Sequence, residues 1–139
     1  MTVFVDTNVL VYAHDSADLQ KATAAIALLT ELWAEGTGAV STQVLQEFYS
    51  VATGKLRPPM SAAEARQVVA DYAEWAVVET NPQLILSATF LHEYDQVSFG
   101  DALIVEAALL AGADTLLTED LQDGRRFGEL TVRNPFLAG

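Results

Sequence analysis

Short apolar runs alternate with longer stretches of helical periodicity along the chain. Each apolar run is bounded by small polar residues or glycine, a pattern typical of buried strands. Strands that alternate with helices form a parallel sheet covered on both faces. The pattern therefore predicts a three-layer α/β/α fold with a short parallel sheet of four to five strands. The four are 3–5, 39–41, 76–78 and 114–118, and 130–132 is the candidate for the fifth.

Capping residues mark where the intervening helices begin. Ser61 and Glu64 have the spacing of a capping box, and Asn81 with Pro82 combines a cap with a first-turn proline. Glycine and proline mark several of the helix ends, because neither residue continues a helix well. The predicted helices are 19–34, 44–53, 61–73, 83–94 and 98–112.

Composition limits the classes of protein that fit. The 139 residues are one domain's worth, so we expect a single domain over 1–139. A net charge of -12 excludes a protein that coats nucleic acid by its overall charge, so any such contact must be local. The lack of cysteine excludes disulfides, thiolate metal sites and cysteine nucleophiles. No signal peptide or spanning segment is visible, and we expect a soluble, cytoplasmic protein with no membrane partner.

Acidic residues stand at the ends of two predicted strands. Asp6 follows the first strand and Asp120 follows the fourth. Ligands of parallel sheets bind beyond the carboxyl ends of the strands, at the point where the strand order reverses. Both acids can therefore lie at one binding site. Two carboxylates about 4 Å apart repel by roughly 4 kcal/mol at an effective dielectric of about 20. We therefore expect a cation between them.

Two further acids lie on predicted helices. Glu47 falls on the flank of the buried stripe that includes Val44 and Phe48, beside a cleft, although an ordinary solvated glutamate fits this position equally well. Asp101 lies in the first turn of the helix capped by Ser98 and shares its apolar face. The alternative role for Asp101 is stabilisation of the helix N-terminus. An aspartate on an apolar stripe is costly to bury unless it is paired or coordinated.

The fourth acid of the proposed group is the least defined by sequence. Asp120 is our first choice. Asp123 is the second, because Asp123 and Gly124 form an Asp-Gly pair, which is typical of a turn. Thr7, Asn8 and Thr118 are neighbours that could orient the acids or a water molecule. Capping of adjacent helices and turns is an equally good explanation for these three residues.

The ligand types favour a hard cation. Oxygen ligands with no cysteine and only isolated histidines favour Mg²⁺, or Mn²⁺, over Zn²⁺. We expect Asp6, Asp101 and Asp120 to hold the ion and Glu47 to orient or deprotonate a water molecule. A divalent ion in this position suits hydrolysis of a phosphodiester bond.

The chain resembles the PIN domain family, and more narrowly the VapC-type ribonuclease toxins. The matching segments are VDTNVL at 5–10, Glu47, SFGDALI at 98–104 and LTED at 117–120. The resemblance spans essentially the whole chain. It implies a Mg²⁺-dependent endoribonuclease with catalytic acids at Asp6, Glu47, Asp101 and Asp120. It also implies a homodimer and a cognate antitoxin that inserts a segment near the acids.

Basic residues are scarce, so the substrate contacts must be few. Lys55 and Arg57 follow the helix that bears Glu47, and Arg125 and Arg126 follow the last acidic motif. Either pair could bind the RNA phosphates that flank the cleaved bond, and a dimer would join two such patches. Solvated surface charge is the alternative for both pairs.

Three other classes of protein fit the sequence less well than a ribonuclease. A phosphohydrolase of small phosphate esters with an aspartyl nucleophile usually needs a second acid two residues after the first, where this chain has Asn8. A phosphoacceptor receiver needs a lysine at a strand end, and the only lysines are Lys21 and Lys55. A non-catalytic PIN-like interaction module would not need all four acids.

Overall fold

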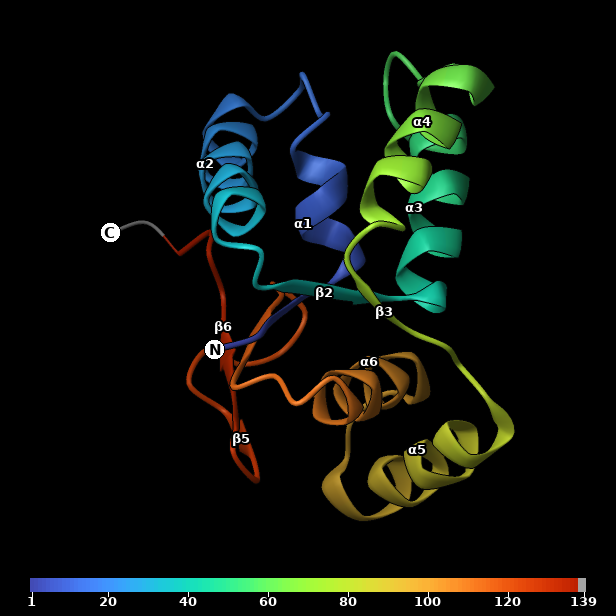
Figure 1. The fold of residues 1–139 in the computed structure, drawn as a ribbon, viewed down its shortest axis with the longest axis vertical. Helices are drawn as coiled ribbons and strands as arrows, with labels where there is room; N and C mark the ends of the chain where they lie inside the picture. Colours follow the sequence, from blue (N-terminus) through green and yellow to red (C-terminus); the bar gives the residue numbers. More distant parts are fainter. Residues whose placement is uncertain (138–139) are drawn as a thin grey trace.

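The computed structural model describes residues 1–137 and has three layers, with a central sheet between two layers of helices (Figure 1). Within these residues the sheet has six strands in the order β3-β2-β1-β4-β6-β5. The strands are β1 (Val3–Val5), β2 (Gly38–Ser41), β3 (Ala76–Val78), β4 (Thr115–Leu117), β5 (Arg126–Phe127) and β6 (Leu130–Arg133). The helices are α1 (Thr7–Tyr12), α2 (Leu19–Glu35), α3 (Thr42–Gly54), α4 (Ala62–Tyr72), α5 (Pro82–Asp95) and α6 (Phe99–Leu110).

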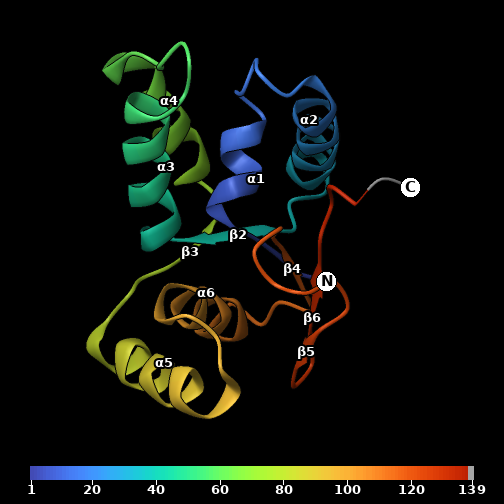
Figure 2. The same cartoon turned by 180° about the vertical axis from the view of Figure 1, so that it is seen from behind.

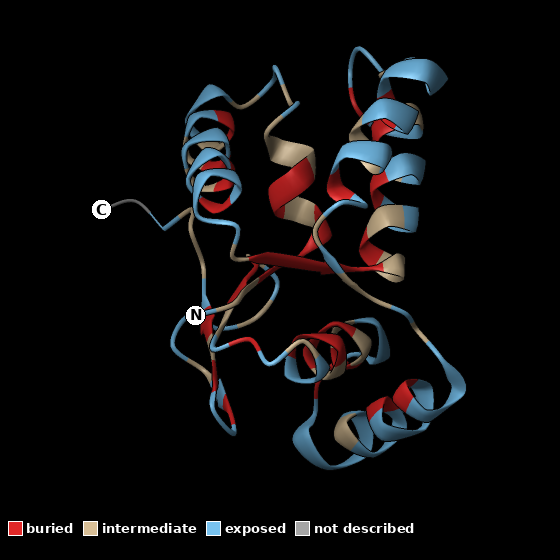
Figure 3. Ribbon diagram, viewed as in Figure 1, coloured by how far each residue is buried: buried red, intermediate tan, exposed pale blue. Residues whose placement is uncertain are grey.

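The two helical layers divide the chain unevenly. Helices α1 to α4 cover one face of the sheet, and α5 with α6 covers the other (Figures 1 and 2). Strand β2 and the inner sides of the helices are buried, whereas the outer sides are exposed (Figure 3). This arrangement confirms the predicted three-layer α/β fold.

The strand count differs from the prediction. Strand β5 is an additional strand that pairs antiparallel with β6, so the sheet has six strands and is parallel except at this edge. It is only two residues long and begins with a charged residue, so it has no apolar run to detect. Gly128, with φ of 62°, begins the two-residue connection to β6. Tertiary pairing across this tight hairpin creates the strand.

The predicted helix starts are confirmed where a cap was identified. Ser61 and Glu64 form a complete capping box, and Asn81 accepts a hydrogen bond from the Leu84 amide. Helix α3 begins two residues earlier than predicted, because Ser41 ends β2 and caps α3 through the Val44 amide at 3.2 Å. The sheet therefore passes directly into the helix that bears Glu47.

The sheet order places a switch point between β1 and β4. The chain proceeds from β1 to β2 and β3 on one side, and β4, β6 and β5 lie on the other. Val5 pairs with Leu117, so the carboxyl ends of β1 and β4 are adjacent. Ligand sites of parallel sheets occur at such points. Among residues 1–137, no helix has both the length and the apolar character needed to cross a membrane.

Candidate active site

Asp6 is the most buried member of the acidic group, which consists of Asp6, Asp101 and Asp120. It ends β1 and caps α1, and only 4% of the residue is exposed. Its Oδ1 accepts a hydrogen bond from the Thr7 amide at 2.7 Å, and its Oδ2 accepts one from the Thr118 hydroxyl at 2.8 Å. Burial nevertheless raises the pKa of Asp6 to about 7, with smaller increases from Asp120 and Glu47. No basic side chain among residues 1–137 forms an ion pair with Asp6.

Asp120 is held at the end of β4 by two polar neighbours. The Asn8 amide group donates to Oδ2 of Asp120 and to the Thr118 hydroxyl, both at 3.2 Å. The Thr118 hydroxyl also accepts from the Asp120 amide at 3.1 Å. Asn8 and Thr118 thus connect the turn after β4 to α1.

Asp101 approaches the group from the other helical layer. It lies in the first turn of α6, where its amide donates to the Ser98 hydroxyl at 3.1 Å. Partial burial raises the pKa of Asp101, the Ser98 hydroxyl opposes this shift, and the charges of Asp120 and Glu47 add to it. The helix cap is therefore formed by Ser98, and the Asp101 carboxylate faces other acids.

Glu47 lies beside the group on α3 and is exposed. Its Oε2 accepts a hydrogen bond from the Thr7 hydroxyl at 3.0 Å, and its Oε1 accepts one from Gln43 at 3.0 Å. The same Gln43 amide lies 3.4 Å from the carbonyl of Gly100, so it links α3 to the start of α6. Sequence reasoning missed Gln43, although its position one helical turn before Glu47 was the available signal.

Three carboxylates are close enough to share one ion. Oxygen atoms of Asp6, Asp101 and Asp120 all lie within 4.8 Å of one another. An all-carboxylate set from three separate chain segments fits a hard divalent cation such as Mg²⁺ or Mn²⁺. A cation there would offset both the mutual repulsion and the desolvation of Asp6.

Asp123, the second choice for the fourth acid, has a different environment. Its Oδ1 accepts a hydrogen bond from the Asn134 amide at 2.8 Å, which connects the loop after β4 to the end of β6. Asp123 is not in the three-carboxylate group. The geometry therefore favours Asp120.

The first pair of basic residues lies away from the acids. Lys55 follows α3 eight residues after Glu47, which is about 12 Å along a helix axis. The Arg57 guanidinium donates to the carbonyls of Gly54 and Leu56 at 3.0 and 2.9 Å. This side chain is therefore folded onto its own loop.

The second pair is divided between two environments. Arg125 donates to the carbonyl of Asp95 at 2.8 Å and stacks over the Phe127 ring at 4.7 Å. Arg126 is exposed on β5, the edge strand.

Arg133 was missed by sequence reasoning. It is exposed at the end of β6, and its carbonyl accepts a hydrogen bond from the Thr118 amide at 3.2 Å. A basic residue at the end of the last predicted strand was the available signal.

Together, the fold and these acids define an α/β domain with a candidate divalent-cation site at the switch point of its sheet. The family model described as PIN domain matches residues 3–127, and the chain belongs to the PIN domain family. The predicted family resemblance is confirmed at this level. No protein of curated function matches the sequence significantly.

Several solved structures share the fold. VapC20 of Mycobacterium tuberculosis, described as a Sarcin-Ricin loop cleaving toxin, is 22% identical over 83% of this chain and 87% of its own, with a TM-score of 0.63. VapBC2 from Rickettsia felis, bound to a promoter DNA fragment, is 20% identical over 96% and 98%, with a TM-score of 0.67. A toxin-antitoxin complex from Klebsiella pneumoniae is 18% identical over 98% of both chains, with a TM-score of 0.68.

Proposed function

We propose that this protein is a metal-dependent endoribonuclease of the VapC type, the toxin of a type II toxin-antitoxin pair. The observation that carries the proposal is the convergence of Asp6, Asp101 and Asp120 at the switch point, with oxygens within 4.8 Å of one another. Membership of the PIN domain family and the likeness to structures described as toxins support it.

Each acid has a role in this proposal. Asp6, Asp101 and Asp120 hold Mg²⁺, with Mn²⁺ as a substitute, and Asn8 and Thr118 keep Asp120 in place. When bound, the ion would supply charge for the scissile phosphodiester and lower the pKa of a water molecule. Glu47 is exposed and accepts one hydrogen bond on each oxygen, so both oxygens keep capacity to accept a proton from the attacking water.

The proposed partners are RNA, a cognate antitoxin and a second copy of the chain. Two of the similar structures are described as antitoxin-containing or promoter-bound complexes, which supports an antitoxin partner. With a net charge of -12, the chain must contact RNA locally, and we assign this role to exposed basic residues such as Arg126 and Arg133.

Cleavage assays test the proposal directly. Purified protein is incubated with total RNA, single-stranded DNA and a small phosphate ester, in Mg²⁺, in Mn²⁺ and in a chelator, with Asp6→Ala as the control. We expect cleavage of RNA alone, dependent on the metal and absent in Asp6→Ala. Hydrolysis of the small ester without RNA cleavage would instead indicate a phosphohydrolase, and no cleavage of any substrate with either metal would indicate a non-catalytic module.

A further inference from the structure

Glu119 separates Thr118 from Asp120, yet its side chain does not join the acidic group. It accepts a hydrogen bond from the Tyr12 hydroxyl at 2.9 Å and forms an ion pair with Lys21 at 3.2 Å. Lys21 also donates to the Tyr12 hydroxyl at 3.2 Å. This is the only ion pair among residues 1–137. The three side chains form a closed triangle in which each one hydrogen-bonds to both of the others.

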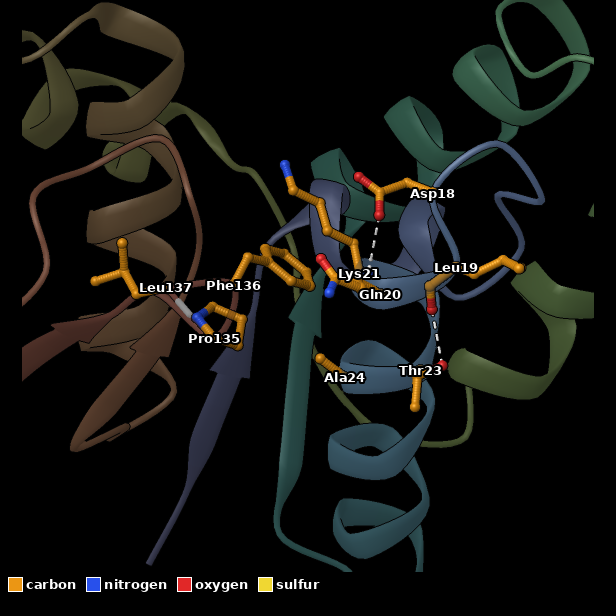
Figure 4. Close-up of a pocket in the computed structure, with 9 residues that line it drawn as sticks. All are labelled: Asp18, Leu19, Gln20, Lys21, Thr23, Ala24, Pro135, Phe136 and Leu137. Carbon is orange, nitrogen blue, oxygen red and sulfur yellow. Dashed lines mark hydrogen bonds between the residues drawn. The ribbon is translucent and has the colours of Figure 1, made fainter. Parts of the chain in front are cut away.

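Aromatic rings also contact the triangle. The Tyr12 and Phe136 rings pack edge to face at 4.9 Å, and the Lys21 ammonium lies 4.5 Å from the Tyr12 ring centre and 5.5 Å from that of Phe136. Figure 4 shows Lys21 extending beside Phe136 in the hollow between α2 and the C-terminal segment. Asp18 caps α2 through the Lys21 amide at 3.1 Å. Lys21 is therefore held by its backbone as well as by its side chain.

The same turn is also tied to the acidic group. The backbone amide of Glu119 donates to Oδ1 of the Asn8 side chain at 3.4 Å, and Nδ2 of the same side chain donates to Asp120. Asp120 is exposed, and its charge contributes to the raised pKa values of Asp6 and Asp101. Repulsion between these carboxylates would displace the turn, and the contacts of Glu119 with Tyr12 and Lys21 resist that movement.

We propose that Tyr12 and Lys21 are positioning residues for the cation site: they hold Glu119, the residue before Asp120, in place and so keep Asp120 within reach of the ion. This inference rests on the proposed function only in taking a divalent cation as the ligand of the acids. Neither residue belongs to the three carboxylates that could hold the ion.

Two substitutions separate positioning from a general effect of charge. Tyr12→Phe keeps the ring against Phe136 and leaves the net charge unchanged, so any change in cation affinity follows from the lost hydroxyl. Lys21→Met removes a positive charge near the site, and the field effect alone would strengthen cation binding. A positioning role predicts the opposite change, weaker cation binding in Lys21→Met.

The test is titration calorimetry of the full chain with Mg²⁺ and with Mn²⁺. We expect Tyr12→Phe and Lys21→Met each to weaken affinity by about twofold to fivefold, a range appropriate to a partly exposed ion pair. Lys21→Arg should retain the wild-type affinity. The matched control is Arg66→Met, which removes a positive charge from an exposed position on α4 and should not weaken binding.

Melting temperatures with metal and with chelator give a second readout. Positioning predicts that the increase in melting temperature caused by metal is smaller in both variants than in the wild type. An equal loss of melting temperature in both conditions, with unchanged affinity, would overturn the inference and leave a structural role alone. If the wild type itself takes up no cation, the proposed function fails as well, so the two failures are distinguishable.

Discussion

The Thr118 hydroxyl donates a hydrogen bond of 2.8 Å to Oδ2 of Asp6, across 112 positions of the chain. This bond joins the end of β4 to the end of β1, and the same hydroxyl accepts from the Asp120 amide. Thr118 is fully buried. One side chain thus both stabilises the central carboxylate and shapes the turn that carries a second one.

Replacing this hydroxyl should destabilise the protein. Thr118→Val conserves shape but removes the partner of the Asp120 amide and leaves Oδ2 of Asp6 with only the longer bond from Asn8, at 3.5 Å. We expect this to cost about 1–3 kcal/mol of the free energy of unfolding. Urea unfolding in the presence of metal measures the loss. Thr131→Val is the control, because no side-chain hydrogen bond of Thr131 is present among residues 1–137, and a comparable loss there would refute the assignment.

Cation affinity should depend on pH through Asp6. Its pKa is about 7 without metal, so below that pH a proton must leave before the ion binds. We expect affinity for Mg²⁺ to fall about tenfold for each pH unit below 7 and to change little above about pH 8. Calorimetric titration between pH 5.5 and about 8.5 tests this, and a pH-independent affinity would contradict it.

The metal-free protein should show the opposite trend in stability. Between the ordinary Asp pKa of 3.8 and the folded value of about 7, the folded state holds a proton on Asp6 that the unfolded state has released. The contribution of Asp6 is therefore fully present below pH 3.8 and is lost as the pH rises through about 7. Urea unfolding in chelator should show this decline, and Asp6→Asn should reduce it. An equally steep decline in Asp6→Asn would assign it to other groups.

Asp101→Asn distinguishes a metal ligand from a helix cap. We expect it to abolish RNA cleavage while leaving the metal-free fold as stable as the wild type or more stable, because it removes one of several repelling charges. Ser98→Ala is the comparison: it should cost about 0.5–2 kcal/mol of stability, because the cap is lost, and should retain cation binding. A clear loss of stability in Asp101→Asn would favour the capping role.

RNA contacts can be assigned from salt dependence. Replacing Arg125 and Arg126 together by alanine should weaken RNA binding and lower the salt slope by about 0.7 per lost phosphate contact. Because Arg125 also bonds the Asp95 carbonyl, Arg126→Ala and Arg133→Ala should be measured separately. Arg66→Ala is the control on α4. An unchanged slope would remove the substituted residues from the substrate site.

Local features of this protein were predictable from the sequence. The caps at Ser61, Asn81 and Ser98 are confirmed, as are the main strands, because these features depend on residues within four positions of one another. The meeting of Asp6 and Asp120 was also predictable, since acids that follow parallel strands share one edge of the sheet.

Other features depend on the order of strands and on contacts between distant segments. Strand β5 exists because it folds back on β6, and its two residues carry no periodic signal. Asp120 lies near Asp6 and Asp101 and contacts Asn8, whereas Asp123 contacts Asn134; these partners lie 112 and 11 positions from the two acids.

The sequence by itself determined the capped helix starts, the main strands and which acids stand at strand ends. The tertiary structure decided that Asp101 joins Asp6 and Asp120, and that Glu119 contacts Lys21 instead. The physical reason is that backbone periodicity and caps are local, whereas the direction of a side chain after a strand depends on the neighbours that packing brings to it.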